Sequence, residues 1–172
     1  MEWFDSFLFL CFISILAFPL VRMIPKDWVH YNQFPFCPFS WEDDGQIYHR
    51  LEIRKWQNKL PDMSKLGLGN LKPKKLKNNA SEDDIRLLLD ETCIAELIHT
   101  LLCFAGIHCI HLWEGTGGIV FYILYVTIFQ LPYICIQRYN RPRLARVYRR
   151  MTKERSTVYE SADIKLQYGR RS

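Results

Sequence analysis

Lysine and arginine are missing from two long stretches of this 172-residue chain, although the chain contains 23 of them. Neither residue type occurs in residues 1–21 or 93–137. Apolar residues instead form three runs, at about residues 3–21, 93–113 and 117–136. Because a helix rises about 1.5 Å per residue, roughly 20 residues cross the bilayer core. The sequence therefore predicts an all-α integral membrane protein with three transmembrane helices.

Other absences exclude competing interpretations of these runs. In a soluble protein, the polar remainder of the chain would have to cover three almost uncharged core helices. A cleaved signal peptide begins with a basic region and ends at a small-residue cleavage site. The first run begins with Glu2 and Asp5 instead, and no such cleavage site follows it. The six cysteines show no C-x-x-C spacing, so neither a disulfide framework nor a zinc site is expected.

Charge placement predicts the orientation in the membrane. Cytoplasmic segments collect lysine and arginine, and here these residues fill the loop 22–92 and the tail 138–172. We therefore expect a multi-pass protein of the cell membrane, forming a single membrane domain over residues 1–172. Its amino terminus and the turn Glu114–Thr116 would lie outside, and its carboxyl terminus in the cytoplasm.

The loop between the first two spans has its own expected structure. Ser40 and Asp43 resemble a helix cap, and a helix from Trp41 to about Asn58 is predicted to lie on the inner leaflet. An ordinary helix packed on the protein is the alternative. The predicted apolar face comprises Trp41, Tyr48, Leu51 and Trp56. Before this helix, aromatic residues are expected at headgroup level: Trp28, Tyr31, Phe34, Phe36 and Phe39.

A basic run later in the same loop indicates contact with membrane lipid. It comprises Lys72, Lys74, Lys75 and Lys77. Lysines near an anionic leaflet are attracted to it. No base-reading module surrounds the run, so no nucleic-acid partner is expected. A second cap, Ser81 with Asp84, predicts a helix that begins at Glu82 and continues into the second span.

Ionisable residues inside a span are costly and are therefore candidates for function. Glu96 and His99 lie three residues apart in the second span, on one helical face. A carboxylate that orients an imidazole prepares it to take a proton from a hydroxyl, and the alternative is a pair that serves helix packing. Di-iron bundles also use E-x-x-H, but they need a second copy of it, so no metal is expected. His108 and His111 are predicted to reach the outer interface.

The third span ends in the basic segment Gln137–Leu144. Its side chains Arg138, Asn140, Arg141 and Arg143 are predicted at the depth of Glu96 and His99. There they would bind an anionic group such as phosphate and stabilise an oxyanion. Orientation alone also explains a basic cluster after a final span, so both interpretations remain open here.

Several segments resemble one family, that of the glycosyl-4,4'-diaponeurosporenoate acyltransferases of staphyloxanthin-type carotenoid biosynthesis. The resemblance covers about residues 28–150 and includes Arg54–Trp56, Glu91–Thr92, Ala95–His99 and, most specifically, Gln137–Leu144. It implies a membrane acyltransferase that esterifies a sugar hydroxyl of a carotenoid glycoside or related glycolipid with a long fatty acyl chain.

The resemblance implies a glycolipid acceptor, a fatty acyl donor such as acyl-CoA and membrane lipid as partners, with no further cofactor. The basic segment would then bind the phosphates of the donor. Glu96 and His99 are the expected catalytic residues. The expected substrate-binding residues are Arg54, Trp56, Gln137, Arg138, Asn140, Arg141 and Arg143. The chain lacks the H-x-x-x-x-D motif of glycerolipid acyltransferases. The alternative function is that of a non-enzymatic membrane subunit in a pigment or envelope-lipid assembly.

Overall fold

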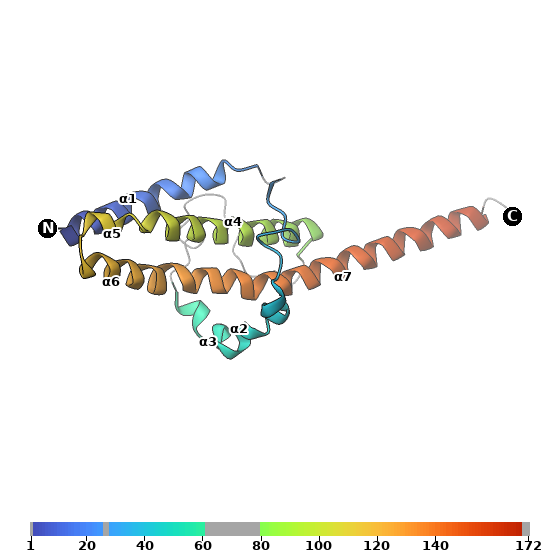
Figure 1. Cartoon of the computed structure of the whole chain (residues 1–172). Coiled ribbons are helices and arrows are strands. Elements are labelled where there is room, and N and C mark those ends of the chain that lie inside the picture. The colour runs from blue at the N-terminus through green and yellow to red at the C-terminus, as the bar shows by residue number, and fades with distance from the viewer. Residues whose placement is uncertain (1, 26–27, 61–79, 170–172) are drawn as a thin grey trace.

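The computed structural model describes residues 2–25, 28–60 and 80–169, which form only helices and loops. Three helical segments in this part are long and apolar enough to cross a membrane. They are α1 (Glu2–Arg22), α4 (Glu82–Gly106) continued by α5 (Cys109–Leu112), and α6 (Thr116–Tyr125) continued by a π-helix (Val126–Gln130) and α7 (Leu131–Gly169). Helix α4 lies between α1 and the third segment (Figure 1). The predicted all-α membrane fold is confirmed.

Local chemistry explains where α4 begins and where α6 turns back. Ser81 Oγ accepts the backbone N–H of Asp84, and the Asp84 carboxylate accepts that of Ser81, as predicted. At the opposite end, Gly115 has a φ of +82°, which favours glycine. A Cβ at position 118 would lie only 2.1 Å from the Trp113 carbonyl oxygen, so this close approach of the chain requires glycine. We call this end of the bundle the turn end.

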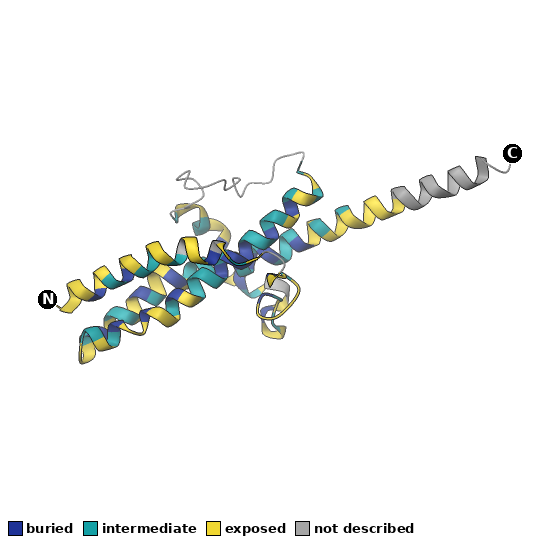
Figure 2. Cartoon of the chain, turned by 90° about the horizontal axis from the view of Figure 1, so that it is seen from above, coloured by how far each residue is buried: buried dark blue, intermediate teal, exposed yellow. Residues whose placement is uncertain are grey.

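The outer sides of the bundle are apolar. Phe12 and Ile15 of α1 are 63% and 75% exposed, and Phe129 of the π-helix is 59% exposed. Figure 2 shows exposed positions along the outward sides of the long helices, while buried positions gather where the helices meet. Side chains of this kind are solvated by lipid rather than by water.

The described residues 28–60, which follow α1, cross α4 and reach the far side of α7 (Figure 1). Two buried clusters hold the described residues 28–60 in place. One joins Val29 and Phe36 to α4, and the other joins Tyr48 and Ile53 to Tyr139 of α7. We call this end of the bundle the loop end.

The predicted continuous helix from Trp41 to about Asn58 is wrong. Asp43 and Glu52 have φ values of 47° and 49°, and a left-handed residue interrupts a right-handed helix. The segment forms four short pieces: Ser40–Gly45, α2 (Ile47–Arg50), α3 (Ile53–Trp56) and Gln57–Lys59. Of the predicted apolar face, Tyr48 is buried on α7, while Trp41 and Leu51 are exposed. The burial of Tyr48 against α7 favours the alternative of a segment packed on the protein.

Helix α7 continues beyond the bundle, past the basic segment Gln137–Leu144 (Figure 1). Pro142 lies within it without ending it. The lysine run at residues 72–77 lies outside the described residues, so its contact with lipid stays a prediction. The single domain over residues 1–172 stays a prediction as well.

Candidate active site

Arg141 of α7 forms the centre of the loop end. Arg141 is only 2% exposed to solvent. Nε donates to the hydroxyl of Thr92, and Nη2 donates to the Thr92 carbonyl and to Glu96 Oε2. Nη1 donates to the Phe36 carbonyl over 2.7 Å. The side chain therefore fastens α4 and the loop segment to α7.

Arg138, three residues earlier on α7, makes the second set of contacts. Its Nε donates to Glu96 Oε1 over 2.7 Å, and its Nη1 donates to Glu42 Oε1 over 2.8 Å. Nη2 donates to the Pro35 carbonyl, and the guanidinium lies 4.3 Å from the ring centroid of Phe39. A planar guanidinium with five donors suits such multiple contacts better than lysine would.

Two carboxylates balance these two arginines. We call Glu42, Glu96, Arg138 and Arg141 the ion-pair network; Glu42 and Glu96 are 2% and 5% exposed. Charges are buried at acceptable cost only when they are paired and hydrogen-bonded. The Tyr48 hydroxyl adds a donor to Glu42. Burial, and secondly this hydrogen bond, raise the pKa of Tyr48 well above its usual range.

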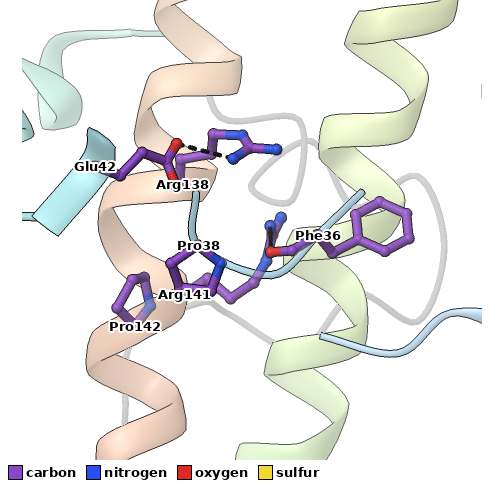
Figure 3. Close-up of a pocket in the computed structure, with 6 residues that line it drawn as sticks. All are labelled: Phe36, Pro38, Glu42, Arg138, Arg141 and Pro142. Carbon is purple, nitrogen blue, oxygen red and sulfur yellow. Dashed lines mark hydrogen bonds and ion pairs between the residues drawn. The ribbon is translucent and has the colours of Figure 1, made fainter. Parts of the chain in front are cut away.

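The network is closely packed. Figure 3 shows Arg138 and Arg141 facing the loop between Phe36 and Glu42, with Pro142 beside them. The cavity among these residues holds only about 10 Å³, which is room for about one water molecule. Arg138 and Arg141 were predicted to bind donor phosphates, and their observed contacts are with the protein itself.

His99 lies one turn along α4 from Glu96, half-buried between α4 and the third segment. Its Nδ1 lies 2.8 Å from Oε1 of Gln130, which is 4% exposed. Its ring stacks on Tyr133, with centroids 4.7 Å apart and planes 8° apart. The orienting contact at Nδ1 thus comes from Gln130, whereas both oxygens of Glu96 accept from arginines.

The remaining predicted binding residues are spread over two helices. Arg143 Nη2 donates to Nε2 of His49, and its guanidinium lies 3.7 Å from the ring centroid of Tyr139. Asn140 reaches the side chain of Gln57 over 3.4 Å. Of the other three, Gln137 is buried on α7, Trp56 donates to the Leu51 carbonyl, and Arg54 is exposed on α3.

The outer histidines belong to the other end of the molecule. His108 and His111 are exposed, and their ring centroids lie 6.2 Å apart. Their location at the outer interface stays a prediction. Within the described ranges, no three His, Cys, Asp or Glu side chains gather as a metal site would require. The expectation that no metal is bound stays a prediction.

Several residues of the site escape detection in the sequence. Glu42 is one acidic residue among several in a polar stretch, and Thr92 reads as an ordinary helical residue. Gln130 gives a signal, because an amide in a lipid-crossing run is unusual. Its partner is not deducible, since the two residues lie 31 positions apart.

Comparison with known proteins identifies the family. A family model described as "Glycosyl-4,4'-diaponeurosporenoate acyltransferase" matches residues 25–150, a range that contains the ion-pair network, His99 and Gln130. A protein of that name from Staphylococcus aureus strain MRSA252 is 31% identical over 129 residues, covering 73% of this chain and 75% of that protein. Those from strains RF122 / ET3-1 and N315 are 30% identical, with the same coverage. No solved structure matches the chain.

The matched range covers well over half of the chain and spans the whole of the site described above. An enzyme, not a non-enzymatic subunit, is therefore the correct class. The chain belongs to the glycosyl-4,4'-diaponeurosporenoate acyltransferase family and is an acyltransferase.

Proposed function

We propose that this chain transfers a long fatty acyl chain from an acyl-CoA-type donor to a sugar hydroxyl of a glycosylated carotenoid or related glycolipid. The observation that carries the proposal is His99, an imidazole held on its edge by Gln130 and on its face by Tyr133. It lies in a span of membrane-crossing length, where an ionisable group is a candidate for function. The names of the relatives supply the acceptor class.

The chemistry needs a base and an activated acyl group. His99 takes the proton of the sugar hydroxyl, and the hydroxyl oxygen attacks the acyl carbonyl carbon. An ester bond forms, the thioester bond breaks, and the proton passes from the imidazole to the leaving thiolate. General-base catalysis of this kind contributes about 10²- to 10⁴-fold in rate.

Glu96 serves this site through the arginines. It pairs with Arg138 and Arg141, which hold the carbonyls of Pro35 and Phe36. The ion-pair network therefore fixes the loop beside the helix that carries His99. With two carboxylates and two guanidiniums, the network is neutral overall and offers little net attraction to an anionic donor.

Arg143 is the better candidate for contact with the donor. It is half-buried at the surface of α7, and its contacts are an imidazole and a tyrosine ring rather than a carboxylate. Guanidinium groups bind phosphates through paired N–H donors. Arg143 would thus hold the donor phosphates while the acyl chain enters the bilayer.

A reconstituted assay tests the reaction. Purified protein in detergent receives a glycosylated carotenoid and a long-chain acyl-CoA, and mass spectrometry detects the ester. His99→Ala should abolish transfer, whereas His108→Ala and His111→Ala should retain it, because they lie about 14–18 Å further along the helix. An acceptor without its sugar should remain unmodified. Full activity in a folded His99→Ala protein would overturn the mechanism.

The donor contact has its own test. Arg143→Ala should raise KM for acyl-CoA by about tenfold or more, as expected for a lost hydrogen bond from a charged group. Arg149→Ala is the matched control, because Arg149 lies further along α7 and is exposed. Equal effects of the two changes would indicate general electrostatic attraction and contradict a defined contact.

The proposed orientation places the loop end in the cytoplasm of the cell, where acyl-CoA is available. The distribution of lysine and arginine supports it. Reporter fusions after Glu91 and after Arg155 should both report a cytoplasmic location, and one within Glu114–Gly117 an external location. An external report from the loop fusion would reverse the orientation and remove the donor argument.

A further inference from the structure

We propose that Gln130 is a positioning residue that selects which ring nitrogen of His99 accepts the substrate proton. The inference rests on the proposed function, because it assumes that His99 is the base. It concerns a residue of the third span, outside the pair that the sequence singles out.

The geometry defines the proton positions. A side-chain carbonyl oxygen only accepts hydrogen bonds, and Oε1 of Gln130 lies 2.8 Å from Nδ1 of His99. The neutral ring therefore carries its proton on Nδ1, which leaves the basic lone pair on Nε2. In a neutral imidazole, the contact at one nitrogen determines the role of the other.

The backbone brings Gln130 to this position. It is the last residue of the π-helix Val126–Gln130, where the extra residue per turn rotates the side chains that follow. Tyr133 lies three residues further on, hence on the same helical face. Two residues of one helix thereby hold the edge and the face of one imidazole. Such π-segments occur frequently at functional sites.

A neutral amide suits this location better than a carboxylate. Gln130 is 4% exposed in an apolar segment, where a further charge would be costly. On α4, Glu96 lies one turn from the ring and is already paired with Arg138 and Arg141 of α7. On the third segment, the titratable neighbour is Tyr133. Gln130 orients the ring without adding a charge.

The first experiment reads the tautomer directly, without requiring activity. Full-length protein with ¹⁵N-labelled histidine rings is studied by NMR in detergent, and the His99 signals are assigned by their loss in His99→Ala. The wild type should show the Nδ1–H tautomer, and Gln130→Leu should shift the population toward Nε2–H. An unchanged tautomer in Gln130→Leu would overturn the inference.

The second experiment reads the same effect in the kinetics. Gln130→Leu should lower kcat by about 10- to 100-fold without changing KM for the acceptor, the range seen when the hydrogen-bond partner of a metal-ligating histidine is removed. Gln130→Glu keeps the size but favours the imidazolium, so the acidic limb of the pH–kcat profile should move about one unit or more toward higher pH. If Gln130→Leu leaves kcat unchanged and Gln130→Glu leaves the acidic limb of the pH–kcat profile unchanged, Gln130 has only a packing role.

Thr127→Val is the matched control, because it removes a polar group from the same π-helix at an exposed position. In Thr127→Val, the His99 tautomer and the pH–kcat profile should equal those of the wild type. The two proposals fail separately. Full activity of folded His99→Ala removes the base and with it the proposed mechanism, whereas an essential His99 with a wild-type-like Gln130→Leu removes only the role of Gln130.

Discussion

The loop end and the turn end of this bundle are built on different principles. At the loop end, two arginines and two glutamates are buried and bonded to one another and to backbone carbonyls. At the turn end, the buried cluster consists of Leu10, Cys109 and Tyr125, while the carboxylate and imidazole side chains are exposed. Contacts between charged groups thus fix the loop end, whereas the turn end combines apolar packing with hydrogen bonds from uncharged groups, such as the one that Cys109 Sγ donates to the Ser6 carbonyl.

This difference explains why a small membrane protein carries so many buried charges. Apolar side chains have little driving force to associate in lipid, because lipid tails are equally apolar. Polar contacts give a defined arrangement instead. The proposed base His99 lies at this end of the bundle, one helical turn from Glu96 of the ion-pair network.

The largest effect is expected from breaking the network at Glu96. Glu96→Ala leaves Arg138 and Arg141 buried without the carboxylate they share, which should cost about 3–5 kcal/mol of unfolding free energy. Equilibrium unfolding in detergent measures it. Glu114→Ala, at the exposed turn, is the control. Equal stability of the two variants would remove the contrast between the ends.

A smaller effect is expected at the edge of the network. Tyr48→Phe removes one hydrogen bond to the Glu42 carboxylate and should cost about 1.5 kcal/mol at neutral pH. Because the folded state raises the pKa of Tyr48, the folded protein retains this proton after the unfolded chain has lost it. The contribution of protonated Tyr48 to the unfolding free energy is therefore complete below about pH 10 and is lost as the pH rises further.

The measurement is the unfolding free energy of wild type and Tyr48→Phe from pH 8 to 11. The wild type should lose more stability above about pH 10 than the variant does. Parallel curves would show that Tyr48 titrates alike in both states and would contradict its burial against Glu42.

The outer histidines lie at the turn end, where little stability is expected from polar side chains. His108→Ala and His111→Ala change exposed residues, so each should alter the unfolding free energy by less than about 0.5 kcal/mol. Thermal unfolding of both variants in the same detergent provides the check. A large loss in either would place a specific contact at the turn end.

The smallest effect is expected for the exposed pair Glu82–Arg155 on α4 and α7. It lies outside the buried network, and exposed pairs contribute little. Glu82→Gln should leave both stability and transfer unchanged within error. A measurable loss would extend the polar fastening of α4 to α7 beyond the buried network.

Some elements of the fold can be predicted from the sequence, and others cannot. The three spans and the Ser81 cap follow from nearby residues, because span length and capping depend on local chemistry. The segment 41–58 does not, since its apolar spacing suits a helix while Asp43 and Glu52 adopt left-handed conformations. Packing of Tyr48 and Ile53 on α7 accompanies these breaks.

The candidate site divides in the same way. Glu96 and His99 stand out in the sequence because a charge or an imidazole is costly in an apolar run. Their partners do not: Glu42 and Arg138 lie 96 positions apart, and His99 and Gln130 lie 31 apart. Pairing Glu96 with His99 followed from helical spacing, yet spacing within one helix says nothing about the helix that packs against it.

The sequence alone determined that the chain forms three apolar helical runs of membrane-crossing length, and that polar side chains enter the second and third of them. These properties depend on composition and on residues within a few turns. Only the tertiary structure decided that the arginines of α7 neutralise Glu96 and Glu42, and that Gln130 meets His99. The reason is physical: a buried polar group takes whichever partner the packing of distant helices brings within hydrogen-bond distance.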